Sequence, residues 1–294
     1  MPELPEVETI VRELNRAKPK VLGSTILDVW SDTKKIIKRP RNFQKFKKEI
    51  LKRKISKIWR RGKNILFELD NKKTLLIHQK LTGHLLYGKW KREKGEWVSL
   101  LKGPLAEDPM NKFLRVIFFL DNGWQISLSD LRKFAKIEIL TEKELEKELS
   151  ELGPEPLDRN FTFEKFKEAI LKKKKGKIKK VLMDQKIIAG IGNIYSDEIL
   201  WEAKIHPLKD ISKISEEGLK KIYFAMREIL KKAIQLKGES ISDYRRISGE
   251  RGYFDRERKV YRREGEKCLR CGTKIKKIKI GQRSAYFCPK CQKL

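Results

Sequence analysis

Near the C-terminus the sequence reads CLRCGTKIKKIKIGQRSAYFCPKC, residues 268–291, and this segment decides the fold of the last module. It holds all four cysteines, as two Cys-x-x-Cys pairs separated by sixteen residues. This spacing is typical of a structural zinc site, because each pair directs two sulfurs at one ion and four sulfurs close its tetrahedron. A redox dithiol is the alternative. We therefore expect one Zn²⁺ in a β-hairpin module, residues 263–294, bound by Cys268, Cys271, Cys288 and Cys291.

The whole chain is strongly basic. Among 294 residues, 71 are Lys or Arg and 40 are Asp or Glu, which leaves a formal net charge of +31. Such an excess suits a polyanion, since each neutralised phosphate releases condensed counterions. A Lys-rich surface set by growth temperature is one alternative. An anionic membrane surface is another, but no long amphipathic anchor stands out. Nucleic acid is therefore the expected partner.

Nothing in the sequence predicts a membrane or secretory segment. No apolar run reaches the roughly 18 residues that a membrane helix needs. The first six residues also lack the basic-then-apolar order of a signal peptide. We therefore expect a cytoplasmic protein without a membrane partner.

The pattern along the chain predicts an α+β protein. After an opening helix at about 6–18, short strand-like segments recur at regular spacing, which predicts a sandwich or barrel. These segments are residues 25–30, 55–60, 64–69, 74–78, 113–120 and 124–128. The turn Asp121-Asn122-Gly123 should join the last two as a hairpin.

A change of pattern marks the domain boundary. Residues 141–152 are acidic and helical in pattern, and Gly153-Pro154-Glu155-Pro156 interrupts them. From 161 to 236 the apolar residues recur at helix spacing. We therefore predict a β domain at 1–140, a linker at 141–156 and a helical domain at 157–262, before the zinc module.

The first residues, Met1-Pro2-Glu3-Leu4-Pro5-Glu6, form a candidate reactive site. Initiator Met is normally removed before a small residue such as Pro, which would leave Pro2 with a free secondary amine. An α-amino group titrates near pH 8, well below Lys, so more of it is nucleophilic at neutral pH. Its attack on an aldehyde-level carbon yields an iminium, with Glu3 and Glu6 beside it as candidate general acid and base. The structural alternative is a proline at a helix start, with glutamates favouring the helix dipole.

A second candidate site is Gly190-Ile191-Gly192-Asn193, which opens a helix at 194–202. Free backbone N–H groups and the helix dipole attract phosphate there. The segment lacks the third glycine and the preceding strand of a dinucleotide fingerprint, so we expect no nucleotide cofactor.

Three motifs in the same order resemble the formamidopyrimidine-DNA glycosylase/endonuclease VIII family. They are Met1–Glu8, Ile187–Trp201 and the cysteine tail, and Leu4–Glu8 resembles the formamidopyrimidine branch. The resemblance implies an N-terminal β-sandwich with a flanking helix, followed by a helix–two-turn–helix element and a zinc β-hairpin. It also implies a monomeric base-excision-repair enzyme, nucleoid-associated, that binds double-stranded DNA containing a damaged base and needs no catalytic metal.

Catalytic roles follow from the resemblance residue by residue. Pro2 would attack C1′ of the damaged nucleotide, Glu3 would be the general acid/base, and Glu6 a supporting carboxylate. Lys63 matches a β-turn lysine that grips a phosphate beside the lesion. The implied activity is that of a bifunctional glycosylase/AP lyase with an N-terminal proline Schiff base and β,δ-elimination.

DNA-binding roles follow in the same way. Asn193 and Arg283 match phosphate-binding residues. Base flipping leaves a gap in the stack, and the residues that would fill it are Leu81, Arg132 and Phe134. Apart from the resemblance, His78 at a strand end is a further candidate phosphate contact, and a packing role is the alternative for it. We expect the other two histidines, His84 and His206, to be structural.

The match weakens at 237–253, the lesion-capping loop of the family. The usual Gly-Gly-Thr/Ser with a following basic residue is replaced by Lys237-Gly238-Glu239-Ser240-Ile241-Ser242, where Ser242 takes the place of the basic residue. The preference among 8-oxoguanine, formamidopyrimidines and oxidised pyrimidines therefore stays open. A catalytically inactive nucleic-acid-binding relative and a translation-associated zinc protein are the alternative functions.

Overall fold

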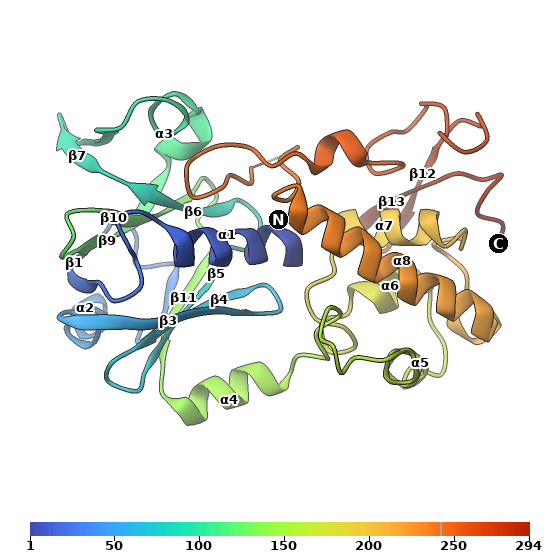
Figure 1. Ribbon diagram of the computed structural model, residues 1–294, viewed down its shortest axis with the longest axis horizontal. Coiled ribbons are helices and arrows are strands. Elements are labelled where there is room, and N and C mark those ends of the chain that lie inside the picture. Colours follow the sequence, from blue (N-terminus) through green and yellow to red (C-terminus); the bar gives the residue numbers. More distant parts are fainter. Residues whose placement is uncertain (242) are drawn as a thin grey trace. The chain divides into compact units, whose positions relative to one another are not determined.

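The computed structural model describes residues 1–241 and 243–294, which form two compact units (Figure 1). The first comprises Met1–Leu149 and Leu236–Asp255, and the second Ser150–Gln235 and Arg256–Leu294. Ser242, named above for the capping loop, lies outside the described residues. Among the described helices, none is long and apolar enough to cross a membrane.

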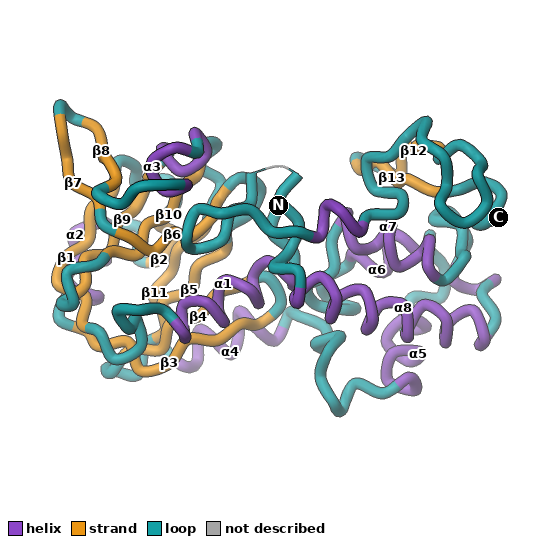
Figure 2. The backbone as a smooth tube through the Cα atoms, turned by 45° about the horizontal axis from the view of Figure 1, so that its top comes forward, coloured by secondary structure: helices purple, strands orange, loops and turns teal. Residues whose placement is uncertain are grey.

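The N-terminal unit is built on a nine-stranded sheet (Figure 2). Its strands are β1 (Thr25–Ser31), β2 (Ile37–Arg39), β3 (Arg53–Arg61), β4 (Asn64–Leu69), β5 (Thr74–His78), β6 (Gly83–Gly88), β9 (Leu114–Leu120), β10 (Gln125–Asp130) and β11 (Lys136–Leu140). Their order is β2-β11-β5-β4-β3-β1-β9-β10-β6. All neighbours are antiparallel except β2 and β11.

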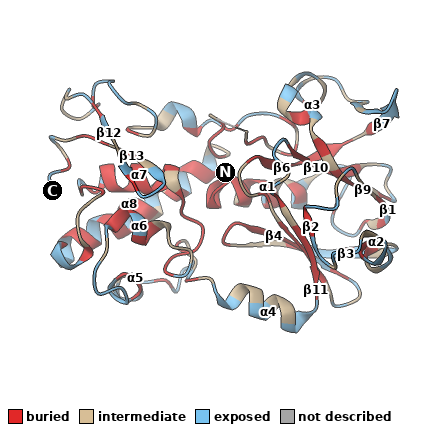
Figure 3. Ribbon diagram, turned by 180° about the vertical axis from the view of Figure 1, so that it is seen from behind, coloured by how far each residue is buried: buried red, intermediate tan, exposed pale blue. Residues whose placement is uncertain are grey.

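Helices and a small hairpin complete this unit. They are α1 (Leu4–Arg16), α2 (Phe43–Ile50), β7 (Trp90–Glu93), β8 (Glu96–Ser99), α3 (Pro104–Glu107), η1 (Pro109–Lys112) and α4 (Glu142–Ser150). Helix α1 packs against β3 and β4. Helix α4 is mostly exposed or half-buried (Figure 3), and rests Leu145 and Leu149 on the outer face of the sheet.

Both halves of the sheet bury the same core. Alternate residues of β4, such as Ile65 and Phe67, share one cluster with alternate residues of β9, such as Val116 and Phe118. Ile10 of α1 joins them. A sheet that closes over its own inner face in this way is a sandwich, so the predicted architecture is confirmed. The predicted hairpin at Asp121-Asn122-Gly123 is present between β9 and β10.

The segment Leu236–Asp255 packs with the sandwich, although in sequence it follows the long helix of the other unit. Arg246 Nε lies 2.6 Å from a carboxylate oxygen of Glu13 in α1. The backbone N–H of Tyr87 in β6 donates to the carbonyl of Ile247 at 2.8 Å. Tyr244 and Ile247 are buried in the sandwich core. The candidate capping loop is therefore anchored on the unit that carries Pro2.

The C-terminal unit is helical and ends in the cysteine module. Its elements are α5 (Phe163–Leu171), α6 (Ile178–Met183), α7 (Asn193–Glu202), η2 (Ile211–Lys213), α8 (Glu216–Gln235), β12 (Lys276–Ile280) and β13 (Arg283–Phe287), with η3 (Phe254–Glu257) at its boundary. The sequence pattern predicted helices in this region and a β module at its end, and both are present.

Helix α7 holds the terminal module through buried acidic residues. Glu198 accepts hydrogen bonds from three successive backbone N–H groups, those of residues 259–261. Asp197 accepts one from the backbone N–H of Tyr286 at 3.1 Å and pairs with Lys179 Nζ at 2.6 Å. Lys179 also donates to the carbonyl of Ser284 at 2.8 Å. These contacts fix β13 against α6 and α7.

The buried ion pair of Lys179 and Asp197 should contribute far more to stability than an exposed ion pair with a similar N···O distance. Asp197→Ala leaves the Lys179 charge buried without its carboxylate, which should lower the free energy of unfolding by about 3–5 kcal/mol. The control is Glu217→Ala, whose partner Lys221 lies 2.7 Å away with both side chains more than half exposed. We expect that change to cost less than about 1 kcal/mol. Urea unfolding measures both, and equal effects would contradict the assignment.

Candidate active site and zinc centre

The start of α1 arranges two carboxylates around the beginning of the chain. Glu3 and Glu6 form a capping box, in which each side chain accepts a hydrogen bond from the other residue's backbone N–H. The Glu3 N–H donates to Glu6 Oε2 at 2.7 Å. Both glutamates are at least 98% buried. The structural alternative for this motif, a capped helix start, is thus correct as local structure, and it also places both carboxylates beside Pro2.

The amine at the chain start lies in an environment that favours its neutral form. Burial lowers the pKa of the Met1 amine below its ordinary value. The carboxylates of Glu3, Glu6 and Asp243 oppose this shift, and the cation of Lys63 adds to it. A neutral amine is the nucleophilic form. Asp243, in the segment 236–255, is an acidic neighbour that the sequence pattern did not single out.

The second oxygen of Glu6 ties the segment 236–255 to this site. The backbone N–H of Glu239 donates to Glu6 Oε1 at 2.9 Å. Gly238 permits this approach, because it has φ +80° and a Cβ there would lie 2.8 Å from that same oxygen. Phe254 N–H donates to the Gly238 carbonyl at 3.0 Å and closes the base of the loop. Glu6 therefore accepts hydrogen bonds both from Glu3 at the start of α1 and from Glu239 in the segment 236–255.

Lys63 lies in the tight turn between β3 and β4. Arg61 pairs with Asn64, so Gly62 and Lys63 form a two-residue loop, and Gly62 has the positive φ, +56°, that a type II′ turn needs. Arg60 secures the turn, since it donates to the Gly62 carbonyl at 3.1 Å and to Glu8 of α1 at 2.9 Å. Lys63 is only 6% exposed. The turn is thereby attached to α1, which begins two residues after the candidate nucleophile Pro2.

His78 ends β5 opposite Asn64, next to the Lys63 turn. Its Nδ1 accepts the backbone N–H of Lys80 at 3.0 Å. Burial lowers the pKa of His78 well below its ordinary value, and the cations of Lys80, Lys63 and Lys136 add to the shift. The ring is therefore neutral with its proton on Nε2, so it can donate a hydrogen bond to a phosphate oxygen.

The candidate gap-filling residues lie on two turns that share one buried carboxylate. Asp130, with no exposed surface, accepts hydrogen bonds from the Thr82 hydroxyl, the Arg132 N–H at 3.2 Å and the Ala135 N–H at 2.8 Å. The Arg132 N–H also reaches Thr82 Oγ1 at 3.2 Å. Asp130 thus joins the turn that carries Leu81 to the turn that carries Arg132. The sequence did not identify Asp130 or Thr82, because nothing local distinguishes a carboxylate that bridges two turns.

The tips of these turns are open to solvent. Phe134 is 41% exposed, although phenylalanine is a residue type that is usually buried. The Arg132 guanidinium lies over the Phe134 ring, 4.7 Å from its centroid. Leu81 is half-buried. An exposed aromatic ring stacked with a cation suits contact with nucleobases.

One polar side chain of the first turn is buried without a hydrogen bond. Gln79 is 1% exposed, and neither its amide nitrogen nor its amide oxygen has a partner among the described residues. Burying such a group unpaired costs about 1–3 kcal/mol. Of the two structural histidines, His84 has a partner for one ring nitrogen, since its Nε2 lies 3.1 Å from Asn111 Oδ1, but its Nδ1 has none among the described residues. His206 Nδ1 accepts the Leu208 N–H at 3.1 Å.

Two further candidate phosphate contacts lie in the C-terminal unit. Asn193 is the first residue of α7, after a loop that the Gln185 side chain braces through Gly190 and Ile191. Arg283 is exposed at the start of β13, after the two-residue loop Gly281–Gln282. The buried Lys179 and Asp197 described above hold the residues that follow Arg283. Their role was not visible in the sequence, where they read only as one more lysine and one more acid on helices.

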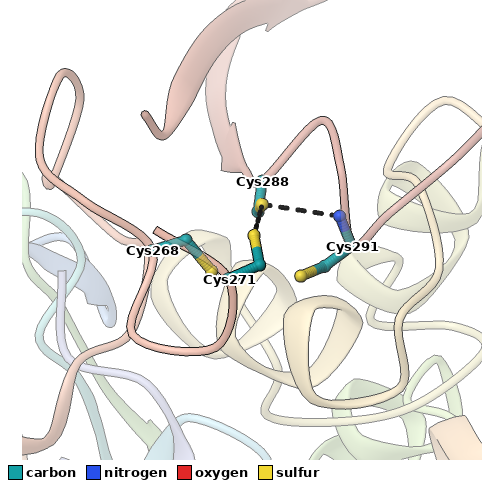
Figure 4. A group of neighbouring side chains, drawn as sticks. All are labelled: Cys268, Cys271, Cys288 and Cys291. Carbon is teal, nitrogen blue, oxygen red and sulfur yellow. Dashed lines mark hydrogen bonds between the residues drawn. The ribbon is translucent and has the colours of Figure 1, made fainter. Parts of the chain in front are cut away.

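The four cysteines converge on one point at the end of this unit (Figure 4). Their sulfurs all lie within 4.8 Å of one another, and Cys271 and Cys288 are 3.4 Å apart. A zinc ion with sulfurs at about 2.3 Å in a tetrahedron needs sulfurs about 3.8 Å apart, whereas a disulfide needs about 2.05 Å. The arrangement therefore fits a closed zinc site rather than a redox pair.

The crowding of the four sulfurs also affects their protonation. A hydrogen bond from Thr273 lowers the pKa of Cys271 to about 6, whereas burial and the neighbouring sulfurs raise that of Cys291 to about 12. Four thiolates so close together need a cation to balance their charge. Trp201 Nε1 donates to Cys268 Sγ at 3.4 Å and orients one sulfur from α7.

Zinc removal should unfold the hairpin module and weaken DNA binding. We expect one zinc per chain by atomic absorption, and four titratable thiols after a strong chelator removes the ion. Cys288→Ala should retain little zinc, since three sulfurs cannot close the tetrahedron. Far-ultraviolet circular dichroism and a DNA-binding titration follow the loss, and added zinc should restore both in the wild type. A disulfide in air, with unchanged DNA binding, would instead support a redox dithiol.

Three family models match the chain in sequence order. The formamidopyrimidine-DNA glycosylase N-terminal domain matches residues 1–137, and the H2TH domain of the same enzymes matches residues 152–245. A zinc finger found in FPG and IleRS matches residues 265–294. Together with the sulfur geometry, this last match assigns the four cysteines to a structural zinc site.

Relatives that match over their whole length belong to the same family. The formamidopyrimidine-DNA glycosylases of Carboxydothermus hydrogenoformans and Pelotomaculum thermopropionicum are 39% and 38% identical, each over 100% of both chains. The structure of Lactococcus lactis Fpg with abasic-site DNA is similar at a TM-score of 0.85 and 34% identity, covering 99% of this chain and 100% of that one. The chain therefore belongs to the formamidopyrimidine-DNA glycosylases, the glycosylase family of base excision repair.

Proposed function

We propose that this chain is a bifunctional enzyme that removes an oxidised base from duplex DNA and then cleaves the backbone at the resulting site. The observation that carries the proposal is the capping box at the start of α1, in which two buried carboxylates, Glu3 and Glu6, follow Pro2 within four residues. Pro2 is the nucleophile once Met1 is removed, because within a peptide bond its nitrogen is an amide and has no nucleophilic lone pair. The enzyme acts on genomic DNA, at the nucleoid.

The chemistry divides one difficult step into easier ones. The Pro2 nitrogen forms a bond to C1′ as the glycosidic C1′–N bond breaks, and the base leaves with that electron pair and a proton. Opening of the sugar ring then gives an iminium between Pro2 and C1′. Loss of a C2′ proton expels the 3′-phosphate, and a second elimination expels the 5′-phosphate. Water releases the sugar fragment and returns the free amine.

The carboxylates and the lysine have separate tasks in this scheme. Glu3 supplies the proton that the ring oxygen needs as it opens, and takes protons up in the eliminations. Glu6 is committed to two backbone N–H groups, so its task is positional. Lys63 and the neutral His78 bind phosphates that flank the lesion, which orients C1′ toward the amine. Asn193 and Arg283 supply further phosphate contacts from the C-terminal unit.

The turns joined by Asp130 fill the gap that base flipping leaves. Leu81 and Phe134 are the apolar wedges, and Arg132 addresses the orphaned partner base. Support comes from the exposure of Phe134 and from the stacking of Arg132 on its ring. A rigid anchor beneath exposed tips is the arrangement that such an insertion requires, since the tips must displace a stacked base without yielding.

Solved relatives support oxidised purines as the lesion class. Lactococcus lactis Fpg has been solved with DNA containing Fapy-dG, and a MutM with DNA containing carbocyclic 8-oxo-G. Their identity to this chain is 33%. In this chain the capping segment is acidic: its Glu239 donates a backbone N–H to Glu6, and its Asp243 acts electrostatically on the amine of Met1. A preference shifted toward oxidised pyrimidines is the second candidate, favoured by this acidic cap.

Borohydride trapping tests the nucleophile. The protein is incubated with duplex DNA that contains 8-oxoguanine, and separately with an abasic site, in the presence of borohydride. We expect a covalent band with both, because borohydride reduces the iminium to a stable amine, and mass spectrometry should place the link on the Pro2 nitrogen. Pro2→Glu, which retains Met1, should lose the band at least about a hundredfold.

An exposed amine elsewhere is the control for this experiment. Lys213→Gln removes an exposed lysine of the C-terminal unit and should trap as well as the wild type. A band with abasic DNA alone would keep the lyase and assign the glycosylase to another lesion. No band with either substrate, from protein shown to begin at Pro2, would contradict the enzyme and favour a binding-only relative.

The anchoring role of Asp130 makes a separate prediction. Asp130→Asn removes the charge that three donors share, and Thr82→Val removes one donor with little change in shape. Both should lower the excision rate on duplex 8-oxoguanine, Asp130→Asn by about tenfold or more. The loss should be larger on duplex than on single-stranded abasic DNA, since a single strand has no gap to fill. Single-turnover rates on the two substrates measure this ratio, and equal losses would reduce Asp130 to a purely structural residue.

A further inference from the structure

Gln79, in the N-terminal unit, has a buried side-chain amide in which both the nitrogen and the oxygen lack a hydrogen-bond partner among the described residues. It lies directly between His78 and the turn that carries Leu81. It is the next residue in the alternation that places Leu75 and Ile77 in the sandwich core. An apolar side chain would satisfy that position. The amide is therefore unexplained by the packing of the free protein.

A second buried glutamine shows the usual solution. Gln125 in β10 is 9% exposed, and both its amide oxygen and its amide nitrogen are hydrogen-bonded to the backbone of one residue, Trp90. Its Oε1 accepts the Trp90 N–H at 2.8 Å, and its Nε2 donates to the Trp90 carbonyl at 3.0 Å. The same side chain in the same unit thus has partners for both amide atoms at position 125 and, within the described part of the chain, for neither at position 79.

The backbone around Gln79 is fixed, so only its side chain is available to move. The Gln79 carbonyl accepts the Gly83 N–H at 3.1 Å, and a Cβ on Gly83 would lie 2.4 Å from that oxygen. The neighbouring Lys80 N–H is held by His78. The unmet amide raises the free energy of the buried rotamer, which lowers the cost of turning the side chain toward a bound partner.

We propose that Gln79 reads a nucleobase and gains its hydrogen bonds only in the DNA complex. A side-chain amide offers N–H donors and a carbonyl acceptor side by side, which matches the donor–acceptor pair on the edge of a base. Such an edge becomes accessible when the duplex opens at the Leu81 turn, either on the orphaned base or on the flipped lesion. This inference rests on the proposed function, in which Leu81 enters the DNA stack.

The test compares Gln79→Leu with the wild type by fluorescence anisotropy at one salt concentration. The probes are duplexes with an uncleavable abasic-site analogue opposite each of the four bases, and a duplex with carbocyclic 8-oxoguanine. We expect the wild type to prefer one opposite base, and Gln79→Leu to lose about tenfold in affinity for that duplex. The free variant should also melt about 2–4 °C higher, because an unpaired buried amide has been removed.

The matched control is Gln125→Leu. It should melt lower than the wild type, because two backbone groups lose their partners, and should keep the wild-type order of opposite bases. A loss by Gln79→Leu on the carbocyclic 8-oxoguanine duplex alone would assign the contact to the flipped lesion. Affinities within twofold on every duplex, or a melting temperature lowered as in the control, would overturn the proposal. Binding requires no chemistry, so a failure of trapping by the wild type would be a separate result.

Discussion

The carboxylate of Glu6 joins the two ends of the N-terminal unit. One oxygen accepts the N–H of Glu3 at 2.7 Å and the other the N–H of Glu239 at 2.9 Å, across 233 residues of sequence. A buried carboxylate is stable only when its oxygens are hydrogen-bonded, so the helix start and the segment 236–255 are held in one geometry. Gly238 is required there because any side chain would collide with Glu6. These two hydrogen bonds therefore fix the backbone of Glu3 relative to that of Glu239.

Each unit carries a candidate phosphate-binding cation at the same kind of hairpin turn. Lys63 and Arg283 each lie at a two-residue hairpin turn that begins with a glycine of positive φ, Gly62 and Gly281. A tight turn has few alternative conformations, so the cation is placed by the sheet rather than by its own flexible chain. The net charge of +31 supplies general attraction to a polyanion, whereas in the proposed function these turns determine where the phosphates are held.

Buried charge in the C-terminal unit serves placement more than stability. Glu198 collects three backbone N–H groups, and Asp197 and Lys179 each bind the backbone of β13. Desolvating a charged pair offsets most of its attraction, but an unpaired member is strongly unfavourable. The zinc hairpin therefore has one orientation on α7 in which every buried charge is satisfied. Asp130 has the same role between the two turns of the sandwich unit.

The sequence by itself determined the features that depend on near neighbours. Cysteine spacing predicted the zinc centre, Asp121-Asn122-Gly123 predicted a hairpin, and the first residues predicted a capped helix beside a candidate nucleophile. Strand β2, its parallel partner β11 and helix α2 were not anticipated, because short segments have weak periodicity and parallel pairing has no local signature. Only the tertiary structure decided which unit holds segment 236–255 and which polar groups are left unpaired. The physical reason is that the hydrogen-bond partners of a buried carboxylate or amide come from elements far away in the sequence.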